Sequence, residues 1–286
     1  MKILVTGGAG FIGSHLSRRL LKDGHQVVIL DNLSTGKKEY LHKDVTFIKG
    51  DIRDPLDIAK AMKGVEAVFH LAALKNVRDN DPDLDFQVNY LAAQNVFDLA
   101  KKVKAKIIFT SSAAVYGDVP VPTAETAPCK PKSQYGKSKL RAEKLLAPEN
   151  SFIVRLFNVY GPLGSNVLND FCKKIPLYED VTIFGTGLQT RDYVHVTDVV
   201  EALVLGLTYN GLYNVGTGQE LSLLSLVDAI KKISNAEPHV KFATGNDNEI
   251  ARSRADITKI KTELQWEPKV SLQKGIEQLV ALAKER

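Results

Sequence analysis

The sequence predicts an α/β protein built on a doubly wound parallel sheet, with a smaller lobe toward the C-terminus. Two observations support the sheet. Strand-like apolar runs alternate with helical patterns through the first half of the chain, and a glycine-rich turn follows the first run directly. A third observation predicts the lobe, because this alternation fades after Asn158 and glycine and proline punctuate the remainder.

Six apolar runs have the length and composition of buried parallel strands. They span residues 2–5, 26–30, 45–49, 67–71, 106–110 and 152–156. Between them, apolar residues recur at helical spacing, which predicts helices over 11–22, 55–62, 83–102 and 134–146. Asp54, directly before Pro55, is typical of a helix N-cap. In such sheets, ligands bind at the carboxyl ends of the strands, where the strand order reverses.

The second half predicts a looser lobe with helices near 197–207 and 223–233. We therefore expect a first domain over 1–157 and a mainly substrate-binding lobe over 158–286. Segments such as 191–215 would return to the first domain, so that the lobe is interleaved with the sheet. His70 and His195 lie in apolar runs and Trp266 lies in "LQWEP", so we interpret all three as structural residues.

Composition and charge limit the function classes. The chain has 286 residues and a formal net charge of +5, with the charges scattered, so nucleic acid is not predicted as a partner. Cys129 and Cys172 lie far apart and form neither a disulfide framework nor a metal-ligand cluster. The N-terminus runs straight into a predicted strand, which leaves no room for a signal peptide, and no apolar run would span a bilayer. We therefore expect a cytoplasmic protein without metal.

The turn "VTGGAGFIG" places Gly7, Gly10 and Gly13 between the first strand and the first helix. Such glycines allow a tight turn and bring the backbone and a helix N-terminus against a pyrophosphate, although a tight turn alone can also require glycine. This context predicts a Rossmann-type dinucleotide site. Asp31 ends the second strand at the expected distance for a ribose ligand. Its carboxylate would repel a 2′-phosphate, which favours NAD over NADP, although Lys37 and Lys38 lie nearby.

Tyr135 and Lys139 in "SQYGKSK" are four residues apart in a predicted helix and share one face. A phenol is a poor base at neutral pH, but a neighbouring ammonium and a positive nicotinamide ring would lower its pKa. Tyrosinate could then take a proton from an alcohol while hydride leaves its carbon. Ser112 lies at the end of a predicted strand. Together with the glycine turn, it favours a catalytic interpretation of the Tyr135–Lys139 pair.

The motifs "TGGAGFIG", "DNLSTGK", "HLAALK", "TSSAAVYG", "YGKSK", "RLFNVYGP", "QTRDYVHVTDV" and "YNVGTG" together resemble the extended short-chain dehydrogenase/reductase superfamily. Within it, the chain is most similar to the NAD-dependent epimerase/dehydratase family and to nucleotide-sugar epimerases of the UDP-glucose 4-epimerase type. The resemblance implies that Tyr135 is the base, that Lys139 assists it and that Ser112 binds the reacting oxygen. It also implies a homodimer formed through the helices near 83–102 and 134–146.

The same resemblance implies two sets of binding residues. The expected NAD ligands are Gly7, Gly10, Phe11, Ile12, Gly13, Asp31, Asn32, Ser34, Thr35, Gly36, Asp51, Ile52, Leu71, Ala72, Ala73, Lys75, Asn89, Ser111, Tyr135 and Lys139. The expected UDP-sugar ligands are Ser112, Ala113, Ala114, Tyr135, Asn158, Asn166, Phe184, Arg191 and Arg252. Arg191 suits that role physically, because a guanidinium grips phosphate oxygens bidentately.

Two departures from the family pattern bear on the reaction and the substrate. Ala113 and Ala114 follow Ser112 where dehydratases carry an acidic pair and decarboxylases a glutamate, so this loop supports only oxidation and re-reduction. Asn246 stands where a diphosphate-binding arginine is expected, and Arg252 or Arg254 could replace it. Ser253 falls at the position that gates sugar size, where a small residue would admit an N-acetyl group.

The predicted function is therefore NAD-dependent 4-epimerisation that interconverts UDP-glucose and UDP-galactose, or their N-acetylhexosamine forms, through a 4-keto intermediate. A 4-ketoreductase or dehydratase acting on a nucleotide-sugar is the alternative. A non-catalytic NAD-sensing protein is a more distant one, because a sensor needs the glycine turn but not the proton-transfer residues.

Overall fold

The computed structural model describes residues 1–75, 81–245 and 249–285 and divides the chain into two compact units. The first unit comprises Met1–Gly117, Pro128–Arg155 and Val200–Tyr213, and the second comprises Asp118–Ala127, Leu156–Val199 and Asn214–Arg286. These bounds differ from the predicted 1–157, 158–286 and 191–215. A segment near residue 120 belongs to the second unit, and the return to the first unit begins only at Val200.

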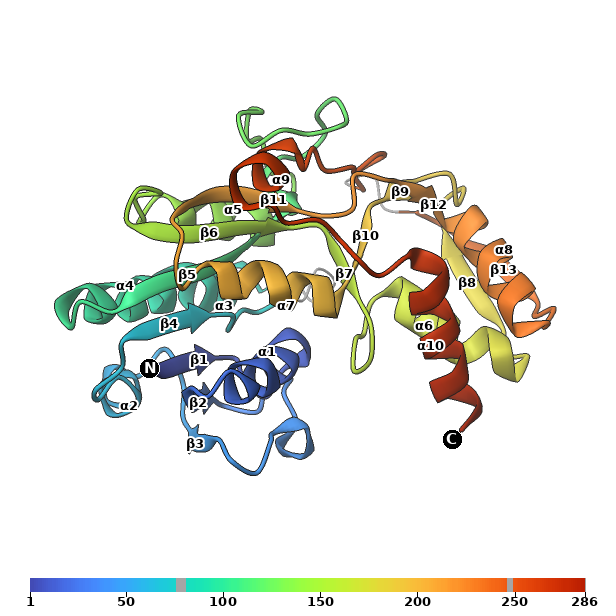
Figure 1. Ribbon diagram of the computed structural model, residues 1–286. Coiled ribbons are helices and arrows are strands. Elements are labelled where there is room, and N and C mark those ends of the chain that lie inside the picture. The colour runs from blue at the N-terminus through green and yellow to red at the C-terminus, as the bar shows by residue number, and fades with distance from the viewer. Residues whose placement is uncertain (76–80, 246–248, 286) are drawn as a thin grey trace. The chain divides into compact units, whose positions relative to one another are not determined.

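The first unit is built around a seven-stranded sheet with the order β11-β6-β5-β4-β1-β2-β3 (Figure 1). Its strands are β1 (Lys2–Thr6), β2 (Gln26–Asp31), β3 (Thr46–Lys49), β4 (Ala67–His70), β5 (Lys106–Ser112), β6 (Ser151–Leu156) and β11 (Gly211–Val215). The pairings among β1 to β5 are parallel. The strand order reverses between β1 and β4, which confirms the doubly wound fold and places its ligand crevice at their carboxyl ends.

Helices cover both faces of this sheet. The core on one face is formed with α2 (Pro55–Ala61), α4 (Ala92–Lys102) and α5 (Gln134–Glu143), through side chains such as Ile58, Phe97 and Ala142. On the other face lie α1 (Phe11–Lys22) and α7 (Val196–Leu205), joined by an ion pair between Arg19 and Glu201 (Figure 1). As predicted, Asp54 caps α2, with its side chain accepting a hydrogen bond from the Leu56 N–H.

The helix predicted over 83–102 is present and contains a π-helical turn. It comprises α3 (Pro82–Phe86), the π-helical turn over Gln87–Leu91, and α4. Within that turn, the side chain of Asn89 bonds to the backbone of Leu74 and to Asp85. Apolar periodicity does not distinguish such a turn from the α-helix on either side of it.

The second unit has three two-stranded sheets. They pair β7 (Asn158–Tyr160) with β10 (Tyr193–His195), β9 (Thr190–Arg191) with β12 (Leu221–Ser222), and β8 (Val181–Phe184) with β13 (Val240–Ala243). Its helices are α6 (Val167–Lys174), α8 (Leu223–Ser234), α9 (Thr258–Leu264) and α10 (Leu272–Lys284). Side chains of α6, α8 and α10 form one apolar core with β8 and β10. Trp266 is buried and donates a hydrogen bond to the Asp198 carbonyl, as its expected packing role requires.

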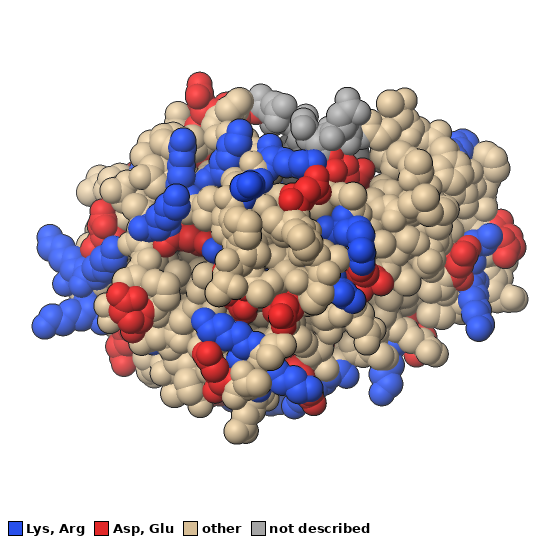
Figure 2. All heavy atoms as spheres, turned by 90° about the horizontal axis from the view of Figure 1, so that it is seen from above, with Lys and Arg blue, Asp and Glu red and all other residues tan. Residues whose placement is uncertain are grey.

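Surface charge is mixed. Lys and Arg side chains are interspersed with Asp and Glu on the face shown in Figure 2. Among the described residues, no helix is both long and apolar enough to cross a membrane. Within the same residues, no group of His, Cys, Asp and Glu has the arrangement of a metal site.

Candidate active site

The turn between β1 and α1 approaches the backbone that follows β4. Gly7 has φ +71°, and a Cβ there would lie 2.7 Å from the Ala72 nitrogen, so a side chain at this position would force the two segments apart. The first helical hydrogen bond runs from Ser14 N to Gly10 O, which leaves the N–H groups of residues 11–13 at the open end of α1. These donors and the helix dipole suit an anion.

Asp31 links the end of β2 to this turn. Its carboxylate accepts hydrogen bonds from the Ala9 N–H at 3.0 Å and the Leu33 N–H at 2.8 Å. A carboxylate can accept about four hydrogen bonds, so Asp31 retains acceptor capacity for ribose hydroxyls. The loop carrying Ser34, Thr35 and Gly36 docks on the same turn through a bond from Lys37 N to Ala9 O.

Asp51 and Ile52, expected near the adenine, follow β3. The Asp51 carboxylate pairs with Arg53 at 2.7 Å and accepts a bond from Asn32 at 2.9 Å. The Arg53 hydrogen bond holds the pKa of Asp51 well below its usual range. Ile52 is buried in the core of the first unit, so its side chain serves packing.

The loop after β4 contains Leu71, Ala72, Ala73 and Lys75 and is held by Asn89. The Asn89 amide exchanges two 2.8 Å hydrogen bonds with the Leu74 backbone and donates a third, also 2.8 Å long, to Asp85. Both of its N–H donors are therefore used within the chain. Asn89 acts here by fixing the loop.

Two adjacent serines end β5 and differ in their contacts. Ser111 is buried, and its Oγ has no hydrogen-bond partner among the described residues. Ser112 is half-buried, accepts a hydrogen bond from the Ala114 N–H at 3.2 Å, and is hydrogen-bonded to Tyr135. Ala113 and Ala114 follow in a short 3-10 turn over Ala113–Val115 and are partly exposed. The loop therefore presents one hydroxyl and two methyl groups.

Helix α5 carries Tyr135, Lys139 and Glu143 at four-residue intervals along one face. Glu143 forms a buried bidentate ion pair with Arg155 of β6, at 3.0 and 2.8 Å. Next to Tyr135, a Cβ on Gly136 would lie 2.4 Å from the Ala114 carbonyl oxygen, so only glycine lets the helix approach the serine loop this closely. These contacts fix Tyr135 relative to Ser112.

Burial sets the titration of the Tyr135–Lys139 pair. It raises the pKa of Tyr135 to about 12, while the Ser112 hydrogen bond opposes this and the Asp85 charge adds to it. Burial also lowers the pKa of Lys139 to about 8. The expected lowering of the tyrosine pKa is therefore absent in the chain alone, because burial of the phenol outweighs the Ser112 hydrogen bond. Lys139 donates one 2.8 Å hydrogen bond to the Thr110 carbonyl and retains two further N–H groups.

Two buried histidines have structural contacts, as expected. His70 bonds to Thr6 Oγ1 at 2.8 Å and packs against Phe97 and Phe109. Burial lowers its pKa to about 3. His195, in the second unit, bonds to Thr197 at 2.8 Å and to Gln278 at 3.1 Å.

The expected substrate ligands all lie in the second unit, apart from the serine loop and Tyr135. Asn158 is in β7, and Phe184 is 42% exposed at the end of β8. Asn166 caps α6, because its Oδ1 accepts the Asn169 N–H at 3.0 Å and its Nδ2 bonds to the Val159 carbonyl. Asn246 lies outside the described residues.

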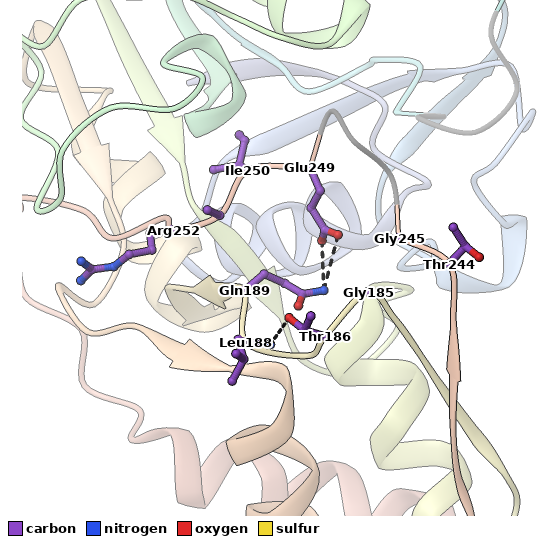
Figure 3. Close-up of a pocket in the computed structure, with 10 residues that line it drawn as sticks. Gly185, Thr186, Leu188, Gln189, Thr244, Gly245, Glu249, Ile250 and Arg252 are labelled. Carbon is purple, nitrogen blue, oxygen red and sulfur yellow. Dashed lines mark hydrogen bonds between the residues drawn. The ribbon is translucent and has the colours of Figure 1, made fainter.

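Both expected substrate arginines are paired with glutamates. Arg191 contacts Glu249 at 3.0 Å and donates to the Thr190 and Ile250 carbonyls, each at 2.8 Å. Arg252 pairs with Glu220. In Figure 3, Gln189 donates hydrogen bonds to Glu249 at the lining of a pocket of about 470 Å³, whereas the Arg252 side chain extends away from them.

A comparison with protein families decides the family. The model of the NAD dependent epimerase/dehydratase family matches residues 3–216. The chain belongs to this family. The predicted membership and the predicted cofactor class are confirmed, so NAD is the cofactor of this nucleotide-sugar epimerase/dehydratase fold. The residues of the site fit NAD. A dinucleotide can engage the open N-terminus of α1 and the remaining acceptors of Asp31. It can also engage the Ser111 hydroxyl, which has no partner among the described residues.

Members of this family with different reactions resemble the chain. It is 38% identical over 305 residues to a UDP-glucose 4-epimerase of Mycolicibacterium smegmatis, covering 98% of this chain and 97% of the relative. It is 32% identical over 306 residues to UDP-glucuronic acid decarboxylase 1 of Arabidopsis thaliana, covering 98% and 69%. A solved Thermotoga maritima UDP-glucose 4-epimerase with UDP-glucose superposes with a TM-score of 0.95 at 35% identity, covering 100% and 99%.

Two carboxylates, one in each unit, were not singled out from the sequence. Asp85 is buried beside Asn89, and one of its oxygens has no partner among the described residues. Its four-residue spacing from Asn89 was a usable signal. Glu249 pairs with Arg191 across 58 residues of sequence, and no local pattern could have predicted that contact.

Proposed function

We propose that this protein catalyses the NAD-dependent 4-epimerisation of a UDP-hexose. The observation that carries the proposal is the serine loop: Ser112 bonds to Tyr135, and Ala113 and Ala114 follow it. Methyl groups can neither donate nor accept a proton, so the loop adds no acid–base group to the Ser112–Tyr135–Lys139 set. That set suffices to oxidise an alcohol and to reduce the ketone again.

In this mechanism, Ser112 and Tyr135 hold the reacting sugar hydroxyl between two hydrogen-bonding oxygens. Tyr135 takes the proton of that hydroxyl and later returns it, and Lys139 supplies the nearby positive charge. The glycine turn and Asp31 would hold NAD, which would supply the hydride acceptor for oxidation of the sugar carbon and the hydride donor for its re-reduction. The small side chains of Ala113 and Ala114 leave room beside Ser112 for the sugar to turn.

The second unit would bind the nucleotide. Among the described residues, Arg191 donates three hydrogen bonds, which use three of its five N–H donors, and the remaining two can bind phosphate oxygens. Asn158, Asn166, Phe184 and Arg252 remain proposed contacts. Ser253 is a small residue, which supports UDP-N-acetylhexosamines as additional substrates.

UDP-glucuronic acid decarboxylation is the competing activity, because relatives with that name match the chain over most of its length. The absence of a carboxylate directly after Ser112 supports epimerisation instead. Asp85 lies in α3 rather than in the serine loop, and its side chain is buried and bonded to Asn89. A 4-ketoreductase would release oxidised cofactor at each turnover, whereas an epimerase retains it.

The experiment is incubation of the purified protein with UDP-glucose, UDP-galactose and their N-acetyl counterparts, with UDP-glucuronic acid in parallel. Interconversion of one hexose pair without added cofactor and without pentose formation supports the proposal. Failure to interconvert any pair would refute it. Tyr135→Phe should lower the rate by about 10²-fold or more.

We also propose a homodimer formed through α3, α4 and α5. Phe86 packs against Tyr90 and under the Arg141 guanidinium, and Leu91 is 41% exposed beside them. Light scattering should give twice the chain mass, and Leu91→Glu should lower it to one chain.

A further inference from the structure

Three arginines of the second unit lie on two neighbouring segments. Arg191 is in β9, and Arg252 and Arg254 follow in the segment that begins at Glu249. The two segments run side by side, since Thr190 N bonds to Ala251 O at 3.0 Å and Ala255 N bonds to the Asp192 carboxylate at 3.1 Å. The cluster also contains Glu220 and Glu249.

Two of the three arginines are neutralised by these glutamates. Arg191 pairs with Glu249, and Arg252 pairs with Glu220. Glu220 is the better buried of the second pair, with 12% of its side chain exposed, and it is also bonded to the Thr190 hydroxyl. Neither carboxylate is therefore available to form a close pair with a third cation.

Arg254 is the third cation. Within residues 1–75, 81–245 and 249–285, its guanidinium forms no hydrogen bond or ion pair, and its Nε is buried without a partner. Its charge acts on Glu220 only at longer range. The backbone of Arg254 is fixed, because its carbonyl accepts the Thr123 N–H at 2.8 Å and Ala255 forms a bridge with Thr123. A fixed arginine with a buried, unpartnered N–H is arranged to receive an acceptor from a ligand.

We infer that Arg254 binds the diphosphate of the nucleotide-sugar and replaces the cation that Asn246 does not supply. The inference rests on the proposed function. Among the described residues, Arg254 is the arginine of this cluster whose charge no close carboxylate cancels. A guanidinium matches phosphate oxygens bidentately, and its bonds to them are charge-assisted.

The test is calorimetric binding of UDP and of uridine to the full chain and its variants. Arg254→Gln should weaken UDP binding roughly tenfold to a hundredfold and leave uridine binding unchanged, because uridine has no phosphate. Arg254→Lys retains the charge without the planar guanidinium, and its affinity for UDP should fall roughly threefold to tenfold. Lys241→Gln removes an exposed cation of the same unit, which pairs with Asp180, and serves as the charge control.

Arg252→Gln separates the two candidates for the missing arginine. If Arg252→Gln weakens UDP binding and Arg254→Gln does not, the assignment is overturned. Equal losses for Arg254→Gln and Lys241→Gln would also overturn it, since they would reflect general charge. Thermal unfolding of each variant checks folding, and Arg254→Lys keeps the test usable if the glutamine variant unfolds. A wild-type chain that binds no UDP refutes the proposed function together with this inference, whereas wild-type binding that is insensitive to Arg254 refutes the inference alone.

Discussion

Arg191 and Glu249 form an ion pair 3.0 Å long, so the arginine expected to hold the substrate diphosphate already carries a carboxylate from its own chain. The Thr190 and Ile250 carbonyls hold the other end of the guanidinium. Glu249 thus orients Arg191 and at the same time cancels part of the charge that would attract an anion.

This relationship predicts that Glu249→Gln binds UDP more tightly. The glutamine oxygen can still accept the Arg191 N–H, while the repulsion between carboxylate and diphosphate disappears. We expect a gain of roughly threefold to tenfold at low salt, measured by calorimetry, which shrinks as salt is added. Glu179→Gln, at an exposed position of the same unit, is the matched control. Weaker binding by Glu249→Gln would mean that orientation of Arg191 outweighs the charge.

The Tyr135 pKa predicts a rate that rises with pH. Burial raises this pKa to about 12 in the chain alone, so the reactive phenolate is the minor form near neutrality. It increases about tenfold per pH unit up to about pH 8, the pKa of Lys139, above which the assisting charge is lost. The Asp85 charge contributes to the elevation, so Asp85→Asn should shift the rising limb toward lower pH. The pH profile of kcat tests this. If Asp85→Asn lowers kcat without shifting the rising part of the pH profile, Asp85 acts only by positioning Asn89.

His70 predicts a loss of stability in acid. Its pKa falls from 6.5 to about 3 on folding, so the unfolded chain binds more protons between these values and stability decreases as pH is lowered through this window. At pH 5 this amounts to about 2 kcal/mol relative to pH 7. Urea unfolding at both pH values measures it, and His70→Asn should show a smaller difference between them. If the free energy of unfolding changes equally between the two pH values in wild type and His70→Asn, the acid sensitivity does not come from His70.

The ion pair between Glu143 and Arg155 predicts a large effect on stability. Both side chains are at most 7% exposed, so Glu143→Gln leaves the Arg155 guanidinium without a counter-charge. We expect the free energy of unfolding to fall by about 3–5 kcal/mol. Glu39→Gln, in the exposed pair with Lys37, should change it by less than about 1 kcal/mol. Replacing both Glu143 and Arg155 with Met should recover part of the loss, whereas additive losses would argue against a coupled pair.

The sequence was sufficient for the sheet, the glycine turn and the Tyr135–Lys139 spacing, because each depends on residues close together in the chain. The helix predicted over 83–102 is confirmed, but apolar spacing does not predict the π-helical turn at Gln87–Leu91 within it. The pairing of Arg191 with Glu249, and the lack of a partner for Arg254 among the described residues, could not be predicted either. They arise where segments 60 residues apart come together, as Thr190 and Ala251 do through a backbone bond.

The central claim is that the Ser112–Ala113–Ala114 loop and Tyr135 limit the chain to oxidation and re-reduction of one sugar carbon. The most direct measurement is nuclear magnetic resonance of UDP-galactose incubated with the purified protein in D₂O. We predict UDP-glucose as the product, with no deuterium on the sugar carbons, because the same hydride leaves and returns. Deuterium at carbon 5, loss of carbon dioxide from UDP-glucuronic acid, or no conversion of any UDP-hexose would contradict the account.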